Sequence, residues 1–496
     1  MQSKKAIIIG SGVAGLATAI RLAVQGFEVS VYEKNALPGG KIAAFDNDGF
    51  TFDAGPSLFT QPKNIEELFT LAGEPIEKYF TYKKLDIACT YFFSNGKVAQ
   101  AYTNKNDFAT ELQQQLHEPA ENVHAYLNQS EKLYNYIGHV FLNHSLHRRN
   151  TWLHKRIFNA VKALKFGYIF QSLSTYNHKK FKTPEAAQLF NRYATYNGSS
   201  PYKAPAMLSL IPHLEQNEGT FYPDGGMISI SNALVNLAKA KGVKFYCNTA
   251  VQRIIHHESK VAGIVVNNEN IFADVVISNA DVYFTFKHLL NNQRRANMVL
   301  KQERSSSAVI FYWGIKKQFN QLQLHNVFFN NAYQQEFTDI FTNKTISANP
   351  TVYVNITSTM DQSHAPLGMQ NWFVMVNAPA NAGQDWEQLV QKAKTAAIQT
   401  LSTHLNEPIE DIIISEKILD PVLIEAQTAS YMGSLYGTSS NSKLAAFLRH
   451  PNFSSTIKGL YFCGGSVHPG GGIPLCLHGA KIVSNLIATS NKATLH

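Results

Sequence analysis

A glycine-rich turn between a buried strand and a helix constrains the fold most strongly. The stretch IIIGSGVAGLATAI runs from Ile7 to Ile20, near the N-terminus. KKAIIIG predicts a short buried strand, AGLATAIRLAVQG a helix closed by Gly26, and FEVSVYEK a second strand. A strand, a helix and a strand within about 30 residues form a parallel unit. The sequence therefore predicts an α/β protein with a parallel sheet.

The glycines of this turn have the GxGxxG spacing of dinucleotide-binding folds. Gly10 permits the tight turn, Gly12 lets the backbone approach a pyrophosphate, and Gly15 lets the helix pack closely on the strand. Glu33 ends the second strand, where its carboxylate can accept a hydrogen bond from a ribose hydroxyl and would repel a 2′-phosphate. NAD and FAD both satisfy this pattern. The predicted contacts also include Ser11, Val13, Ala14 and Lys34.

Length and cysteine content limit the remaining possibilities. The chain has 496 residues, 45% of them hydrophobic, which is enough for a globular protein with two or three lobes. Its four cysteines show no metal-type spacing, so we expect a reducing compartment, no disulfide framework and no structural metal. Lys4 and Lys5 precede an apolar run, but glycines and Arg21 interrupt it, so we interpret it as mature protein. No stretch predicts a membrane-spanning helix.

The positive charge is concentrated in one segment. The net charge is +9, and no acidic residue lies between Glu131 and Glu185. Leu153, Ile157, Val161, Leu164 and Tyr168 share one face of a predicted helix there. Such a helix could lie in an anionic lipid interface, or it could pack on the protein's own core. A nucleic-acid patch is disfavoured because no recognition motif accompanies the charge. The nine cations of residues 148–182 are Arg148, Arg149, Lys155, Arg156, Lys162, Lys165, Lys179, Lys180 and Lys182.

The rest of the chain alternates between helical and strand-like regions. Residues 110–195 are mostly helical in pattern, and Val243–Asp281 predicts short strands with turns at Glu258–Ser259 and Asn267–Asn268. Strands dominate residues 305–380, and a helix follows near 385–405. No repeat or low-complexity linker separates these regions, so we expect interleaved lobes.

Four motifs follow the glycine turn. They are LPGGK (Leu37–Lys41), GFTFDAGPS (Gly49–Ser57), YPDGGM (Tyr222–Met227) and GLYFCGGSVHPGGGIP (Gly459–Pro474). A glycine pair and a cation soon after the acid are typical of flavoproteins of the glutathione-reductase type. In order and content, the four motifs resemble those of the carotenoid desaturase family, in particular its bacterial phytoene desaturase group.

The resemblance implies a glutathione-reductase-type, Rossmann-like FAD-binding fold with two additions. The first is a mixed-sheet substrate domain and the second a helical, membrane-facing subdomain. We expect the FAD-binding domain in residues 1–72, 220–285 and 455–496, the substrate domain in 73–110 and 286–454, and the helical basic subdomain in 111–219.

The resemblance also implies that FAD is the cofactor and that both ends of the chain hold it. Val251 would offer its backbone to the adenine, and the helix beginning near Ile473 and Pro474 would stabilise negative charge on a reduced flavin. The other expected contacts are Gly40, Lys41, Gly55, Pro56, Ser57, Gly464, Gly465, Ser466 and Gly472. No catalytic base is assigned. His468 is a weak candidate that could equally be a structural histidine, and Asp53 could be a strand-end carboxylate.

The implied reaction is hydride transfer from an acyclic C40 carotenoid to the flavin, with a quinone or oxygen as electron acceptor. Such a substrate favours a cytoplasmic enzyme bound peripherally to the inner face of the cell membrane through residues 148–182. GPSLFTQP (Gly55–Pro62) and GGSVHPGGGIPL (Gly464–Leu475) are similar to the sub-family that introduces a 3,4 double bond into 1-hydroxylated carotenoids. Multi-step phytoene desaturation is the alternative. A flavin amine oxidase, a carotenoid isomerase, a terminal-methyl oxidase and a non-catalytic lipid-binding protein of the GTPase dissociation inhibitor type are further ones.

Overall fold

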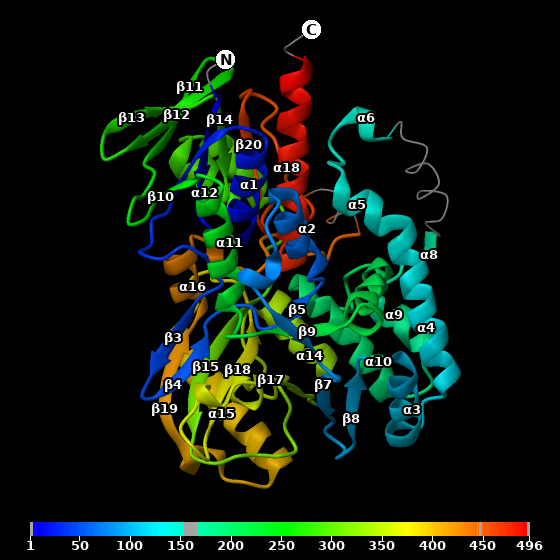
Figure 1. Cartoon of the computed structure of the whole chain (residues 1–496). Helices are drawn as coiled ribbons and strands as arrows, with labels where there is room; N and C mark the ends of the chain where they lie inside the picture. Colours follow the sequence, from blue (N-terminus) through cyan, green and yellow to red (C-terminus); the bar gives the residue numbers. More distant parts are fainter. Residues whose placement is uncertain (1–2, 153–165, 444, 446–448, 494–496) are drawn as a thin grey trace.

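The computed structural model describes residues 3–152, 166–443, 445 and 449–493 (Figure 1). A five-stranded parallel sheet and a seven-stranded mixed sheet form its two main layers, and a group of helices packs beside the mixed sheet. The chain passes between these parts several times. The expected interleaving of lobes is therefore confirmed.

The parallel sheet has the strand order β10-β2-β1-β14-β20. Its strands are β1 (Lys5–Ile9), β2 (Glu28–Tyr32), β10 (Lys244–Tyr246), β14 (Val275–Ser278) and β20 (Leu460–Phe462). The register places Ile7 of β1 opposite Ser30 and Val276, so the N-terminal strand lies at the centre. The predicted unit of strand, helix and strand is confirmed.

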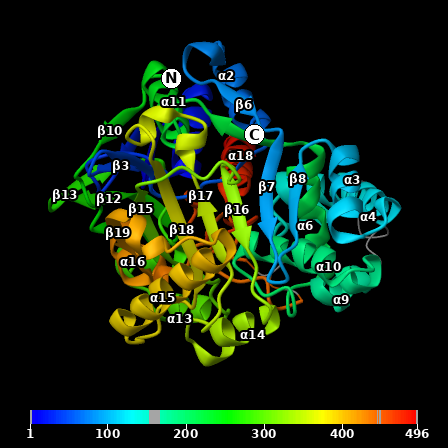
Figure 2. The same cartoon turned by 90° about the horizontal axis from the view of Figure 1, so that it is seen from below.

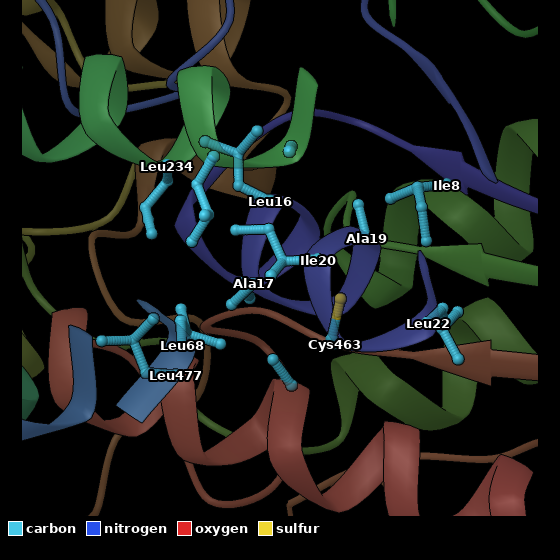
Figure 3. Close-up of a cluster of buried hydrophobic side chains, with 14 of the residues drawn as sticks. Ile8, Leu16, Ala17, Ala19, Ile20, Leu22, Leu68, Leu234, Cys463 and Leu477 are labelled. Atoms are coloured by element: carbon cyan, nitrogen blue, oxygen red, sulfur yellow. The ribbon is translucent and has the colours of Figure 1, made fainter. Parts of the chain in front are cut away.

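Helices cover one face of this sheet. They are α1 (Val13–Val24), α2 (Lys63–Ala72), α11 (Ile228–Ala240) and α18 (Ile473–Ala493). Leu16 and Ile20 of α1, Leu234 of α11 and Leu477 of α18 meet in one buried cluster, which Figure 3 shows. An antiparallel sheet of β11 (Arg253–His257), β12 (Lys260–Val266) and β13 (Glu269–Phe272) packs near the opposite face. Residues of these elements are far apart in the sequence, so burial of their apolar faces joins both ends of the chain.

The mixed sheet has the order β19-β15-β18-β17-β16-β7-β8. Its strands are β7 (Ile87–Phe92), β8 (Val98–Tyr102), β15 (Ser307–Ile315), β16 (His325–Phe328), β17 (Val352–Asn355), β18 (Gln370–Ala378) and β19 (Ile413–Leu419). All neighbours pair antiparallel except β16 and β7, which are parallel. Helix α15 (Trp386–Leu405) packs on one face, against Trp313 and Trp372. The strands expected in 305–380 and the helix expected near 385–405 are confirmed.

Helices α3, α4, α9 and α10 lie beside β7 and β8 (Figure 2). The helical region comprises α3 (Lys105–Leu116), α4 (Ala120–Leu133), α5 (His139–Asn143), α6 (Arg149–Trp152), α8 (Phe166–Phe170), α9 (Leu173–Lys180) and α10 (Pro184–Asn191). Side chains of Asn104, Ser172 and Thr183 cap α3, α9 and α10. The apolar face expected from Leu153 to Leu164 lies outside the described residues. Within the described ranges no helix has both the length and the apolar character to span a membrane.

Two small sheets connect these parts. One pairs β3 (Ala44–Asn47) with β4 (Phe50–Asp53), and the other has the order β5-β9-β6. Strand β9 (Thr220–Pro223) pairs with both β5 (Phe59–Thr60) and β6 (Tyr82–Lys84). It thus joins segments that we expected in two different domains. The domain boundaries remain a prediction.

Candidate functional site

A cavity of about 910 Å³ lies where the ends of the parallel strands face the mixed sheet and the helical region. Gly10 and Gly12 from the start of the chain line it together with Gly472 from its end. The size is at the upper end of the range for small-molecule sites, which is about 300–1,000 Å³. Both glycine-rich runs therefore serve one cavity.

Eighteen of the twenty residues predicted to bind the cofactor line this cavity. The exceptions are Ser11 and Gly15, which lie behind the lining and support it. The eighteen are Gly10, Gly12, Val13, Ala14, Glu33, Lys34, Gly40, Lys41, Gly55, Pro56, Ser57, Val251, Gly464, Gly465, Ser466, Gly472, Ile473 and Pro474.

The first glycine run forms a cradle at the start of α1. Gly10 has a φ of +91°, in the left-handed region that glycine adopts without strain. A Cβ on Gly12 would lie 2.8 Å from Asn279 Nδ2, and one on Gly15 would lie 2.3 Å from the carbonyl oxygen of Gly10. No side chain caps the helix at Gly12, so the amide groups of its first turn are free to bind an anion. This cradle fits the pyrophosphate of a dinucleotide.

The carboxylate of Glu33 is buried at the end of β2 and has three donors. Its Oε2 accepts hydrogen bonds from the amide and the hydroxyl of Ser11, at 2.8 and 2.7 Å. Its Oε1 accepts one from the amide of Asn35 at 2.9 Å. A carboxylate oxygen can accept two hydrogen bonds, so Oε1 retains a lone pair for a ribose hydroxyl. Ser11 thus orients the acid that the sequence identified.

The opposite end of the cradle is formed by Gly55, Gly465 and the loop before α18. A Cβ on Gly55 would lie 1.8 Å from the carbonyl oxygen of Lys41, so the two segments touch through their backbones. The ammonium group of Lys41 donates to the carbonyl oxygen of Leu435 at 3.0 Å, and burial lowers its pKa. Only glycine at position 55 permits so close an approach of the two backbones.

Arg449 is a buried cation at this end. Its Nη1 donates to the carbonyl oxygens of Tyr436 and Gly465, at 3.1 and 3.3 Å, and its Nη2 to that of Thr438 at 2.8 Å. Burial lowers the pKa of Arg449 to about 10, so the guanidinium stays charged at neutral pH. This charge favours a bound group that becomes negative.

His468 is buried and is not among the described residues that line the cavity. Its Nε2 lies 3.0 Å from the carbonyl oxygen of His144, and burial lowers its pKa to about 4. These contacts are those of a neutral imidazole that holds neighbouring segments together. Asp53, at the end of β4, accepts hydrogen bonds from the amide of Met227 with both carboxylate oxygens, at 3.0 and 3.1 Å. It is therefore a strand-end carboxylate at the start of α11.

The remainder of the cavity is mostly apolar, and the helical region supplies much of its wall. Ile137, Phe141, Leu208 and Ile211 line this part. Between it and the cofactor loops lies a polar cluster of Ser57, Arg192, His325 and Tyr353, of which the sequence analysis identified only Ser57. Apart from Ser57, these residues belong to no recognisable motif. The alternation of inward-facing positions in β16 and β17 is the signal that could have indicated two of them.

Comparisons with known proteins agree with this geometry. Residues 13–488 match the family described as flavin containing amine oxidoreductase. Over 98% of its length the chain is 48% identical to the 1-hydroxycarotenoid 3,4-desaturase of Flavobacterium sp. (strain P99-3), and the match covers 100% of that protein. It is 30% identical to the 4,4'-diaponeurosporene oxygenase of Staphylococcus aureus (strain MSSA476), with 99% of both chains covered.

Solved structures show a similar fold at low sequence identity. An oxidoreductase from Methanosarcina mazei superposes with a TM-score of 0.63 at 16% identity, over 97% of this chain and 100% of that chain. Putrescine oxidase bound to putrescine also has a TM-score of 0.63, at 14% identity and with 99% of both chains covered. The expected FAD-binding fold is therefore confirmed.

Proposed function

The chain belongs to the flavin containing amine oxidoreductase family and, within it, to the carotenoid desaturases, and from this premise we propose that it introduces the 3,4 double bond into a 1-hydroxylated acyclic carotenoid. The observation that carries the proposal is the 48% identity to a 1-hydroxycarotenoid 3,4-desaturase over the full length of both chains. The cavity supports it, because the cofactor loops and a long apolar wall face the same space.

FAD is the cofactor, and when bound it supplies a two-electron acceptor for hydride removed from carbon. The residues present fit this cofactor. The first turn of α1 would hold the pyrophosphate, Glu33 the ribose, and the backbone near Val251 the adenine. Arg449 holds positive charge at the other end, where it would favour the reduced form of the cofactor, and Lys41 lines the same part of the cavity.

The apolar wall binds the polyene and excludes water from the reacting carbons. Ile137, Phe141, Leu208 and Ile211 come from the helical region, so the substrate chain extends from the cofactor loops toward these helices. Burial of a hydrocarbon chain against such side chains stabilises the complex by about 25 cal/mol per Å² of apolar surface.

The alternative functions have weaker support. Phytoene desaturation lacks a comparably similar relative among the comparisons reported above. A non-catalytic lipid-binding protein does not require a complete cofactor cradle, whereas Gly10, Gly12, Glu33 and Gly472 all line the cavity here.

We further infer that the enzyme is cytoplasmic and binds peripherally to the inner face of the cell membrane. Two aromatic residues on either side of residues 153–165 are exposed, Trp152 by 48% and Phe170 by 54%. Tyr136, in the π-helical turn Tyr134–Gly138 that follows α4, is exposed by 57%. Large exposed aromatic side chains next to basic residues are typical of interfacial segments. A quinone in the same membrane, or dissolved oxygen, is the proposed electron acceptor.

The test is an anaerobic reduction experiment. FAD-loaded protein is mixed with vesicles that carry either phytoene or a 1-hydroxylated acyclic carotenoid, while the flavin absorbance is followed and the carotenoid is identified afterwards. We expect bleaching with the hydroxylated compound, together with one new double bond at carbons 3 and 4. Bleaching with phytoene alone would contradict the proposal and favour the multi-step enzyme. Absence of bleaching with both would contradict the reaction class.

A further inference from the structure

The proposed function leaves the polar cluster of Ser57, Arg192, His325 and Tyr353 without a role. Resting on that function, we propose that His325 and Arg192 bind the hydroxyl group on carbon 1 of the substrate and so place carbons 3 and 4 beside the cofactor loops. His325 and Arg192 would thereby decide which carotenoids are accepted.

The orientation of His325 follows from the register of the mixed sheet. His325 and Val327 are alternate residues of β16, so their side chains point to the same face, and both line the cavity. Tyr353 of β17 is opposite Val327 in the pairing and lines the cavity too. Phe328 lies on the other face, in the core beneath α15. The His325 side chain is 2% exposed and faces the cavity from the sheet.

The hydrogen bonds of His325 determine which ring nitrogen carries the proton. Nδ1 lies 2.7 Å from the hydroxyl of Tyr353 and 3.2 Å from Nδ2 of Asn355. An amide NH₂ group can only donate, so Nδ1 is an acceptor and the proton of the neutral ring is on Nε2. Burial, and next the charge of Arg192, lower the pKa of His325 to about 3, so the ring is neutral at physiological pH.

Nε2 of His325 is therefore a buried N–H group, and it has no hydrogen-bond partner among the described residues. A buried donor without an acceptor is costly, and most such groups in folded proteins have a partner. The cavity that His325 lines is the space from which an acceptor oxygen can come. A ligand with a hydroxyl group satisfies this requirement, whereas a pure hydrocarbon does not.

Arg192 supplies a second donor nearby. Its Nη1 donates to the hydroxyl of Tyr91 at 2.6 Å, and its guanidinium lies 5.0 Å from the ring centre of Tyr196. Arg192 lines the cavity as well. A hydroxyl oxygen has two lone pairs, so it can accept from His325 and from the guanidinium at once. The cluster thus suits an uncharged oxygen acceptor.

The cluster also lies at a suitable place for the reaction. Tyr353 is 2.7 Å from the hydroxyl of Ser57, and Ser57 belongs to the loop that begins with Gly55 beside Lys41. In a 1-hydroxylated carotenoid one carbon separates carbon 1 from carbon 3. An anchor for the hydroxyl must therefore lie close to the cofactor loops, and the hydrogen bond between Tyr353 and Ser57 joins the cluster to one of them.

The experiment compares two acyclic carotenoids that have the same polyene and differ in the 1-hydroxyl. FAD-loaded wild-type protein and the variants His325→Phe and His325→Gln are assayed anaerobically in vesicles for the rate of flavin reduction. Binding of the corresponding desaturated products is measured separately, from the shift of the carotenoid absorbance. We expect His325→Phe to lower the preference for the hydroxylated compound about tenfold in both measurements, since one hydrogen bond is lost. His325→Gln keeps an N–H donor and should therefore retain most of the preference for the hydroxylated compound.

His404→Phe is the matched control. His404 packs against Phe92 and Phe328 on the other face of the mixed sheet and is not in the cavity lining. His404→Phe should leave the preference for the hydroxylated carotenoid unchanged. A preference that persists in His325→Phe would overturn the inference while leaving the proposed function intact. If wild-type protein reduces its flavin with neither carotenoid, the proposed function itself fails. Should His325→Phe not retain FAD, His325→Leu replaces it, since leucine is smaller and also lacks an N–H group, and an unchanged preference there would equally contradict the inference.

Discussion

The contacts of the Glu33 carboxylate predict that this residue contributes directly to cofactor binding. Replacing it by alanine removes the ribose acceptor and leaves two donors of Ser11 without their partner. We expect Glu33→Ala to weaken FAD binding at least about tenfold, because each lost hydrogen bond to a charged group is worth about 1.5–3 kcal/mol. The measurement is the dissociation constant from flavin fluorescence. Glu28→Ala, at the exposed start of the same strand, is the control. An unchanged affinity for FAD in Glu33→Ala would contradict the assignment of Glu33 to the cofactor site.

Gly15 tests the packing behind the cradle. A Cβ there would lie 2.3 Å from a backbone oxygen of Gly10, which cannot move aside as a side chain could. We expect Gly15→Ala to lower the stability by at least about 2 kcal/mol, as overpacking commonly does. The apparent unfolding temperature of the FAD-loaded protein measures the effect.

Gly479→Ala in α18 is the control for this packing argument. Its Cβ would lie 3.6 Å from the carbonyl oxygen of His468, an ordinary contact. The change should be neutral or raise stability by up to about 1 kcal/mol, since alanine favours the helix. Similar destabilisation in both variants would show that steric contact with Gly10 is not the cause.

The site residues that could be predicted lie close together in the sequence, whereas those that were missed lie far apart in it. Gly10, Gly12 and Glu33 could be predicted because a strand, a turn and a helix within one short segment determine their geometry. His325 and Arg192 come together through pairing of β16 with β17 and packing of the helical region, and no local pattern encodes that meeting. Motifs therefore indicated the cofactor, whereas specificity residues required the tertiary structure.

Among the elements, α11 has an unusual acid at its start, and this predicts a pH dependence of stability. Burial raises the pKa of Asp53 to about 6, above the value of about 3.9 in an unfolded chain. Between these values the folded protein binds a proton that the unfolded chain has lost. The stabilisation that this bound proton gives the folded protein is therefore fully present below about pH 4 and is lost as the pH rises through 6.

Asp53→Asn should not show this loss. Wild type should lose about 1 kcal/mol of its free energy of unfolding between pH 5 and pH 7, and the variant should not. The difference between the two proteins should therefore shift by about 1 kcal/mol in favour of the variant, as measured by thermal unfolding at both pH values. Asp224→Asn, at a half-exposed carboxylate paired with Lys83, should show no such change. A constant difference between Asp53→Asn and wild type would argue against a buried, protonated Asp53.

Elements with a strong pattern of their own matched the structure best. Strand β1, helix α1 and helix α15 were predictable because each carries its own buried face. The parallel pairing of β16 with β7 was not predictable, because Thr90 and Asn326 are 236 positions apart and no single turn connects their strands. Such pairings arise from the whole chain.

At the scale of the whole molecule, the cavity explains why the chain passes repeatedly between its parts. Loops of the parallel sheet supply the glycine cradle, and the mixed sheet and the helices supply the apolar wall. The reaction needs both in one space from which water is excluded. Segments from both ends of the chain and from its middle therefore line the same cavity, and Gly12, Tyr353 and Gly472 are examples.

The last prediction concerns how the whole molecule meets a membrane. The excess positive charge lies in residues 148–182, and the exposed side chains of Trp152 and Phe170 lie within this segment. Each cation near an anionic surface contributes about 1 kcal/mol at moderate ionic strength. Replacing Lys155, Arg156, Lys162 and Lys165 by glutamine should therefore weaken binding to anionic vesicles at least about tenfold, as measured by co-sedimentation.

Flavin content should stay unchanged in this variant, because none of the four residues belongs to the sequence motifs that are expected to bind the cofactor. The matched control replaces four exposed cations elsewhere, Lys239, Arg253, Lys260 and Lys344, and so changes the net charge equally. A general effect of net charge would weaken vesicle binding to the same extent in both variants. A local docking surface would weaken it in the first alone, and raised salt would then reduce wild-type binding toward the level of that variant. Full-strength binding by the first variant would show that this segment does not dock the enzyme on the membrane.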